Sequence, residues 1–351
     1  MSTFIQLHLL TSYPPSNLNR DDLGRPKTAV MGGKTRLRVS SQSLKRAWRT
    51  SDLFSEAMKG HVGTRTKIMG IEVYNALRER KIADGKAKEW AKQIAEVFGK
   101  CKKANTDKPL EELEIEQLAH FSPEEKTAIF ALVDRLAVAA TAPTVTDLTL
   151  LQKRHTAADI AMFGRMLASS PAFNTEAAVQ VAHAVTVHDV AVEDDYFTAV
   201  DDLNNGEEDM GAAHIGETEF AAGLFYLYLC INRDLLVENL GDDKELANKA
   251  LGALVESAAK VAPNGKQNSF ASRAYASYVL AEKGEQQPRS LSVAFLKPVR
   301  GEDILAKAIS EMETKRTNME KAYGPCADDR KAMNAETGEG SLNDIIAFVK
   351  G

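Results

Sequence analysis

Residues 34–49 read KTRLRVSSQSLKRAWR, a strand pattern that runs directly into a helix pattern. In the first part, Leu37 and Val39 alternate with Arg36 and Arg38, as they would in a strand with one buried face. The alternation predicts a strand whose outward face is cationic.

A helix is expected to follow at once, capped by Ser40, Ser41 or Ser43. Its apolar residues recur at helical spacing and predict one buried stripe, formed by Leu44, Ala47 and Trp48. A different face collects residues at positions i, i+3, i+4 and i+7, namely Gln42, Lys45, Arg46 and Arg49. Because that face carries no carboxylate, it is suited to follow an anionic strand.

The charge of the chain is distributed unevenly. The whole sequence has a formal net charge of −5, which read alone disfavours a nucleic-acid partner. Residues 1–50, however, contain nine basic side chains and only two acidic ones, a formal +7, while the remaining 35 basic and 47 acidic residues give −12. This asymmetry indicates an anion-binding patch on an otherwise acidic body.

The rest of the sequence alternates strand and helix patterns. Further strands are predicted over residues 4–10, 179–187, 222–231, 272–281 and 290–296. Helices are predicted over residues 68–81, 87–100, 123–139, 145–151, 244–260 and 302–321. Residues 11–31 are expected to form a long irregular loop, residues 189–219 a hairpin or flexible projection, and residues 345–349 a short terminal helix or strand. This order predicts an α+β fold with a ferredoxin-like or RRM-like sheet and a helical insertion.

Several classes of protein are disfavoured. The longest apolar runs fall short of the roughly 20 residues that span a bilayer, and the N-terminus has no secretory pattern. Three scattered cysteines, Cys101, Cys230 and Cys326, form neither a metal-binding pair nor a disulfide framework. These features predict a soluble cytoplasmic protein with no membrane partner.

Catalytic motifs are missing. Gly32-Gly33-Lys34-Thr35 is similar to the end of a phosphate loop, but it lacks the upstream glycine and precedes a strand. The seven histidines show no metal-ligand spacing on a helix. We therefore expect no enzymatic activity, no cofactor and no bound metal. A small-molecule enzyme on a ferredoxin-like sheet has no motif in its favour.

Asp21 and Asp22 keep one catalytic alternative open. They form an adjacent carboxylate pair in a basic environment, and such a pair could hold Mg²⁺ for phosphodiester cleavage. The favoured reading is structural: one of them pairs with Arg20 or Arg25 and orders the loop, because two adjacent carboxylates seldom complete a metal site.

Two other segments carry binding chemistry. Phe197 and Ile215 are isolated apolar residues on the projection, where they could stack against bases or close their own hairpin. The lysines of the segment 100–108, which include Lys100, Lys102 and Lys103, form a basic loop between helices that could bind a nucleic acid.

Several blocks of this sequence closely resemble the CasC family, the Cas-seven-type backbone subunits of type I-E CRISPR Cascade complexes. The blocks occur in order, and they are residues 19–22, 32–34, 36–47, 159–166, 182–184, 197–203, 214–216 and 219–220. They cover roughly residues 1–50 and 155–230. Little of residues 60–155 and 235–351 matches the family pattern.

The resemblance implies an RRM-like palm over residues 1–59 and 180–351, helical fingers over 60–179 and a β-hairpin thumb over about 189–220. Copies of such a subunit stack head-to-tail along the guide RNA (crRNA) and kink it at regular intervals, so that target DNA pairs with the exposed bases. The RNA-binding residues expected here are Arg20, Lys34, Arg36, Arg38, Ser40, Gln42, Lys45, Arg46, Arg49, Met166, Phe197 and Ile215.

The resemblance also implies partners. These are crRNA, target DNA through base pairing to it, further copies of the chain, and the large, small, 5′-handle-binding and crRNA-endonuclease subunits of Cascade. With target DNA as a partner, we expect Lys100, Lys102 and Lys103 to contact it, on the ground of their charge and not of the family pattern. Members of this branch do not cleave, whereas related subunits in other CRISPR types cut target RNA with a loop aspartate, which keeps the Asp21/Asp22 alternative open.

Overall fold

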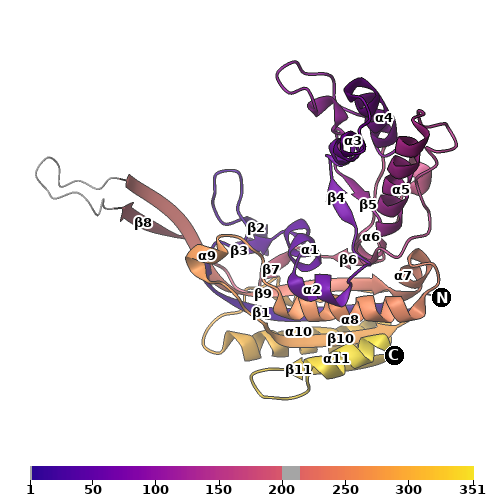
Figure 1. The fold of residues 1–351 in the computed structure, drawn as a ribbon. Coiled ribbons are helices and arrows are strands. Elements are labelled where there is room, and N and C mark those ends of the chain that lie inside the picture. Colours follow the sequence, from indigo (N-terminus) through magenta and orange to yellow (C-terminus); the bar gives the residue numbers. More distant parts are fainter. Residues whose placement is uncertain (1, 200–213) are drawn as a thin grey trace, which may run out of the picture. The chain divides into compact units, whose positions relative to one another are not determined.

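A computed structural model describes residues 2–199 and 214–351 (Figure 1). The chain divides into two compact units. The first contains residues 1–54, 181–231 and 251–351, and the second contains residues 55–180 and 232–250.

The first unit is built on one sheet with strand order β11-β10-β1-β9-β7-β3-β2. These strands are β1 (Phe4–Ser16), β2 (Thr28–Met31), β3 (Lys34–Val39), β7 (Ala184–Thr186), β9 (His214–Asn232), β10 (Ala276–Gly284) and β11 (Asp329–Asn334). The pairings of β1 with β10, β10 with β11, β2 with β3, β3 with β7 and β7 with β9 are antiparallel. The α+β fold predicted from the sequence is confirmed.

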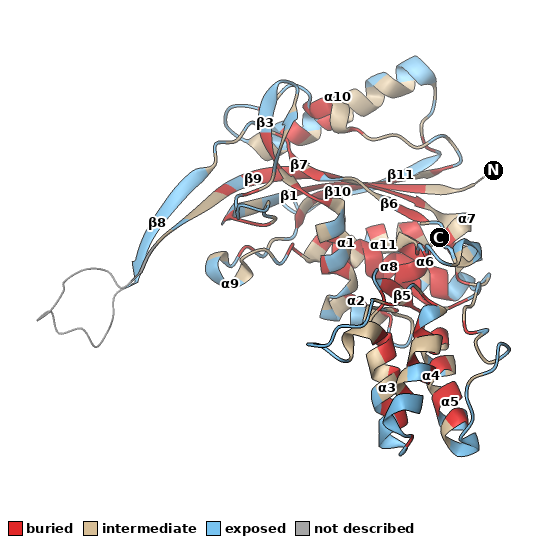
Figure 2. Ribbon diagram, turned by 90° about the horizontal axis from the view of Figure 1, so that it is seen from above, coloured by how far each residue is buried: buried red, intermediate tan, exposed pale blue. Residues whose placement is uncertain are grey.

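Helices cover this sheet on both faces. Figure 2 shows α10 (Ile304–Tyr323) on one side of the strands, and α1 (Ser41–Arg49) and α11 (Leu342–Lys350) on the other. For that reason every residue from Ile5 to Leu10 is buried, including His8. The His8 ring donates to or accepts from Tyr226 Oη at 2.8 Å and lies 3.3 Å from a carboxylate oxygen of Glu282. The alternation of Ile5, Leu7 and Leu9 with Gln6 and His8 predicts a strand with only one buried face, and that prediction is wrong because both faces of β1 are buried.

A hairpin extends from the sheet. β8 (Glu193–Ala199) pairs with the first part of β9, from Glu193 opposite Phe220 to Ala199 opposite His214. All residues of β8 are exposed (Figure 2). The predicted projection over residues 189–219 is thus a hairpin in its described part, and residues 200–213 of that prediction lie outside the described residues.

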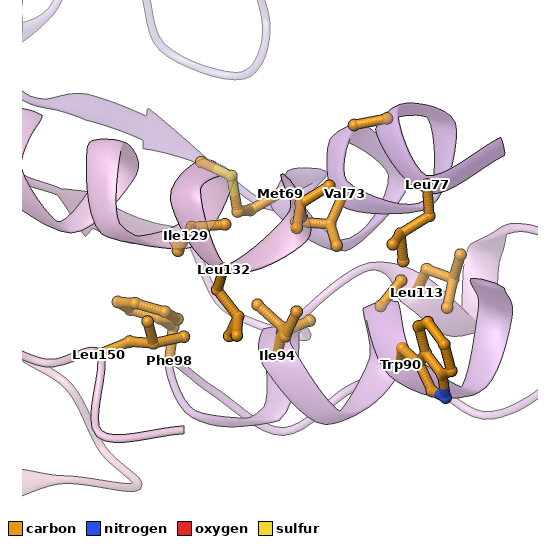
Figure 3. Close-up of a cluster of buried hydrophobic side chains, with 14 of the residues drawn as sticks. Met69, Val73, Leu77, Trp90, Ile94, Phe98, Leu113, Ile129, Leu132 and Leu150 are labelled. Atoms are coloured by element: carbon orange, nitrogen blue, oxygen red, sulfur yellow. The ribbon is translucent and has the colours of Figure 1, made fainter. Parts of the chain in front are cut away.

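The second unit is mainly helical. Its main helices are α3 (Met69–Glu79), α4 (Asp84–Glu96) and α5 (Pro123–Ala139), with the strands β4 (Thr64–Thr66) and β5 (Ala119–Phe121) paired beside them. Figure 3 shows their apolar side chains meeting in one core, with Trp90, Phe98 and Leu132 among them. Ser122 and Glu125 form a capping box at the start of α5, and Pro123 occupies its first turn.

A buried ion pair fixes the segment that precedes Met166. The Arg165 guanidinium lies 2.6 Å from the Glu125 carboxylate and also donates to the carbonyl oxygens of His120, Gln152 and Phe173. Because a buried guanidinium needs this many acceptors, Arg165 joins four separate parts of the second unit.

The remaining elements are short or connect the others. They are α2 (Asp52–Ala57), η1 (Glu111–Leu113), α6 (Ala158–Phe163), η2 (Pro171–Phe173), β6 (Val179–Val181), α7 (Arg233–Asn239), α8 (Lys244–Lys260), α9 (Gln267–Phe270) and η3 (Ser292–Phe295).

Two predicted elements are absent, and local hydrogen bonds explain both. The helix predicted over residues 145–151 does not form, because Thr144 and Asp147 bond each other's backbone and side chains in an isolated turn. The strand predicted over 290–296 is instead the 3₁₀ helix η3, next to the Ser290 hydroxyl, which accepts from the Ser292 N–H.

Candidate nucleic-acid interface

Helix α1 presents the basic face predicted from the sequence. The Ser40 hydroxyl caps it by accepting from the Ser43 N–H, and Leu44, Ala47 and Trp48 are buried. The helix contains no acidic residue, and Arg46 and Arg49 lie in its last turn, where cations favour the helix dipole. Apolar packing on one side therefore presents the basic side chains of the other.

The loop before β2 is fixed to this helix by hydrogen bonds. Asn19 Oδ1 accepts from the Ser40 N–H at 2.9 Å, and the Asn19 carbonyl accepts from the Lys27 N–H at 2.8 Å. Asp21 Oδ1 accepts from the backbone N–H groups of Leu23 and Arg25, both at 2.9 Å. Asp21 thus orders the loop, as the favoured reading held, but through backbone groups and not through an arginine side chain.

The base of the hairpin holds the same loop. The Arg25 guanidinium forms an ion pair with the Glu219 carboxylate at 3.1 Å. The Asn17 side-chain amide donates to the carbonyl oxygens of Gly24 and Glu219. These bonds leave the loop with a defined conformation beside α1.

A polar cleft of about 440 Å³ lies between the loop and the helix. It brings together Arg20, Arg46 and the two aspartates of the loop. Sequence reasoning missed its far wall, which is formed by Asn264 and Gly265. A Cβ atom on Gly265 would lie 2.2 Å from the Leu18 carbonyl oxygen, so this position requires glycine. Pro263 and Gly265 indicate a turn in the sequence, and this turn is the signal that could have identified the wall.

Arg36 does not belong to the interface, and its prediction as an RNA-binding residue was wrong. Its side chain is fully buried, and the guanidinium donates to the carbonyl oxygens of Thr186 and Phe295, each at 2.9 Å. The strand β3 therefore has a mixed outward face: Lys34 is exposed, Arg38 is half-buried and Arg36 is a structural cation.

The other predicted residues of this region differ in exposure. Gln42 and Arg46 are exposed, Lys45 and Arg49 are half-buried, and Ser40 is buried because its hydroxyl caps α1. Partial burial lowers the pKa of Lys45. Withdrawal from water penalises the charged form, so an anion beside this ammonium would be favourable.

A histidine that was not predicted lies beside these residues. His183 Nδ1 accepts from the Ser41 N–H at 3.0 Å, at the first turn of α1. Its partial desolvation and the charges of Arg38, Lys27 and Lys45 lower its pKa. In the sequence, His183 appears among the histidines without metal-ligand spacing and within a block of family resemblance, but it is not predicted as a binding residue.

The apolar candidates lie in two different units. Phe197 pairs with Gly216 across the hairpin, and its ring covers that glycine so closely that a Cβ there would lie 2.3 Å from the ring. Ile215 pairs with Thr198 in the same hairpin. Met166 is 81% exposed and belongs to the second unit, at a cleft of about 250 Å³ that is also lined by Phe98 and Leu118.

Two lysines of the loop in the second unit form ion pairs with glutamates that follow the loop in the sequence. Lys102 lies 2.8 Å from both Glu111 and Glu114, and these two carboxylates raise its pKa. Lys100 forms an ion pair with Glu116 at 3.2 Å, whereas Lys103 is exposed.

Two further features are absent from residues 2–199 and 214–351. This part of the chain holds no group of three or more His, Cys, Asp and Glu side chains arranged for a metal ion. It also holds no helix with the length and apolar character needed to cross a membrane.

Known proteins identify the family. The profile of the CT1975-like protein family matches residues 5–346. A chain from a solved "CRISPR RNA-guided surveillance complex, pre-nicking" is 31% identical, with a TM-score of 0.85 over 99% of both chains. A chain from a "CRISPR RNA-guided surveillance complex" is 26% identical, with a TM-score of 0.73 over 98% of this chain and 99% of that one. No curated protein sequence matches significantly. The resemblance to Cas-seven-type backbone subunits is confirmed, and the chain belongs to the CT1975-like protein family.

Proposed function

We propose that this chain is a crRNA-binding backbone subunit of a type I-E Cascade surveillance complex. Copies of it polymerise head-to-tail along the guide RNA, kink it periodically and present its bases to complementary target DNA. The sequence of the target is then read by base pairing, and the protein recognises the RNA backbone. The chain acts as a scaffold and not as an enzyme.

The observation that carries the proposal is the acid-free basic face of α1 beside the ordered loop at Arg20. Guanidinium and ammonium groups bind phosphates without regard to base identity, which is what a subunit that must accept any guide needs. Arg20 and Arg46 line one polar cleft, and neither forms a salt bridge within the described residues. Their charge is therefore available to a phosphate.

The first unit corresponds to the palm, and the hairpin of β8 and β9 to the thumb. We propose palm boundaries of residues 1–59, 180–231 and 251–351, thumb residues of about 189–220 and finger residues of 60–179 and 232–250. Residues 232–250 cluster with the second unit and are better counted with the fingers. Phe197 and Ile215 on the thumb of one copy, with Met166 of the neighbouring copy, would contact the base displaced at each kink.

The proposed partners follow from this role. They are crRNA, target DNA paired to it, further copies of the chain, and the large, small, 5′-handle-binding and crRNA-endonuclease subunits of Cascade.

Co-expression with a CRISPR array and its processing endonuclease tests the proposal. We expect the purified chain to carry RNA of discrete guide length in a particle much larger than the monomer. The Lys45→Gln/Arg46→Gln/Arg49→Gln variant, expressed in parallel, should lose that RNA. A wild-type chain that remains monomeric and free of nucleic acid, even when the other Cascade subunits are supplied, would refute it.

The endonuclease alternative loses support from the loop geometry. Asp21 Oδ1 already accepts two backbone N–H groups, and Asp22 has no companion carboxylate outside the pair in the lining of the cleft. The decisive assay is incubation of the guide-loaded complex with complementary RNA and Mg²⁺. Cleavage that disappears in Asp22→Ala would restore this alternative, and intact RNA would remove it.

A further inference from the structure

His183 occupies an unusual position in the first unit. It lies between β6 and β7, and its ring lies beside the first turn of α1, where Nδ1 accepts the Ser41 N–H at 3.0 Å. A ring nitrogen that accepts a hydrogen bond carries no proton. In the neutral ring the proton must therefore reside on Nε2, which makes Nε2 a donor.

The surroundings of the ring are cationic. The charged groups that act on His183 are Arg38 from β3, Lys27 from the preceding loop and Lys45 from α1, and none of them is acidic. The side chain is exposed, and Nε2 has no hydrogen-bond partner in the described parts of the chain. Three positive charges around an outward N–H donor form a site for an anionic oxygen.

We propose that His183 binds a phosphate of the guide RNA through Nε2, as a neutral hydrogen-bond donor held in the correct tautomer by Ser41. This inference rests on the proposed RNA-binding function and adds a residue to it. Lys45 and Arg38 supply positive charge at the same place. His183 adds a hydrogen bond of defined direction, because its ring is fixed at Nδ1 and donates from Nε2.

The neutral form is the one that the geometry favours. Protonation of Nδ1 would replace its acceptor by a second donor facing the Ser41 N–H, and the neighbouring cations oppose the added charge. The lowered pKa of His183 has the same direction and keeps the ring neutral near pH 7. RNA binding through His183 should therefore not depend on its titration.

Two substitutions separate binding from a purely structural role. His183→Asn places an amide oxygen where Nδ1 was, so it can still accept the Ser41 N–H, but it has no group at the Nε2 position. His183→Gln reaches the Nε2 position with an amide that can donate, but it leaves Ser41 without its acceptor. The structural role requires Nδ1, and the binding role requires Nε2.

The measurement is fluorescence anisotropy of a labelled single-stranded RNA with the full-length chain at several salt concentrations. We expect His183→Asn to weaken binding about fivefold, with an unchanged melting temperature and an unchanged salt slope, because a neutral donor releases no counterion. His183→Gln should bind better than His183→Asn. Lys45→Gln, the matched control, should instead lower the slope by roughly 0.7.

The possible results give different conclusions. If His183→Asn and the wild-type chain bound RNA with equal affinity, the inference would be overturned while the proposed function would stand. A lower salt slope in His183→Asn, or an advantage of wild type that grows as the pH falls from about 8 to about 6.5, would mean a charged imidazolium and would also overturn it. No binding of RNA by the wild-type chain would remove the proposed function together with this inference.

Discussion

The chain contains two lysine- and arginine-rich regions, and they differ in where their carboxylates lie. In the first region, residues 34–49 hold six basic residues and no acidic one. In the second, the loop over residues 100–108, Lys100 and Lys102 are ion-paired with Glu116, Glu111 and Glu114. A count of positive charge alone would treat both as nucleic-acid sites.

The difference shows how a fold makes charge available or removes it. Helix α1 buries Trp48 on one side, so its basic residues project from the other side of the same short helix. The lysine loop lies against η1 and the segment after it, and the acidic residues of that segment neutralise it. Exposed ion pairs contribute little to stability, but they also leave little charge for a ligand.

The largest effect is expected for Lys45→Gln/Arg46→Gln/Arg49→Gln. Removal of three cations should lower the slope of log Kd against log salt by roughly 2 and weaken RNA binding about 100-fold at about 0.1 M salt. Anisotropy titrations over a range of salt measure both quantities. An unchanged slope would show that the face of α1 does not contact phosphate, and the palm assignment would be wrong.

Within the first region, Arg36→Met should affect stability, whereas Arg38→Met should affect RNA binding. Arg36→Met leaves the carbonyl oxygens of Thr186 and Phe295 without a donor and should destabilise the first unit by about 2 kcal/mol. Arg38→Met should leave stability nearly unchanged and lower the salt slope of RNA binding by roughly 0.7.

Urea denaturation followed by tryptophan fluorescence measures the first effect. The chain has two tryptophans, Trp48 in the first unit and Trp90 in the second, so a Trp90→Phe background restricts the signal to the first unit. Equal stability of the two variants would contradict the structural role of Arg36.

Most of the fold could be predicted because long periodic segments carry their own signal. Helix α1, with its serine cap, and α5, with Pro123 at its start, were predicted to within two residues of their observed bounds. Strand β11 was missed, because its residues DRKAMN are largely exposed and show no alternation of apolar and polar residues. The sheet edge that it forms depends on pairing with β10, a contact between distant parts of the sequence.

The candidate site was predictable where one element presents several residues, and not where distant segments meet. The spacing of Lys45, Arg46 and Arg49 is a property of one helix. By contrast, the burial of Arg36 is decided by carbonyl groups 150 and 259 residues away, which no local pattern contains. Asn264 and His183 reach the site in the same way, through tertiary contacts.

The two aspartates of the loop should also differ in effect. Asp22→Asn removes a negative charge near the expected phosphate and should strengthen RNA binding about threefold. Asp21→Ala removes the acceptor for the N–H groups of Leu23 and Arg25, and the loosened loop should bind RNA about threefold more weakly. Asp21→Asn keeps an acceptor at the same place and is the control. If Asp21→Ala strengthened binding as much as Asp22→Asn, the loop geometry would not matter.

The smallest effect is expected for Lys100→Gln/Lys102→Gln/Lys103→Gln. Lys100 and Lys102 already form ion pairs with glutamates. Of the three substituted lysines, only Lys103 has no salt bridge to a carboxylate in the described part of the second unit. Kd for single-stranded RNA should stay within about twofold of wild type, and the salt slope should fall by no more than one cation contributes, roughly 0.7. The same titration with guide-loaded complex and target DNA tests the predicted DNA contact of this loop. A fall of roughly 2 in the slope for DNA would mean that the glutamates release their lysines when DNA binds. Both basic regions would then bind nucleic acid, and the second would do so only after its ion pairs break.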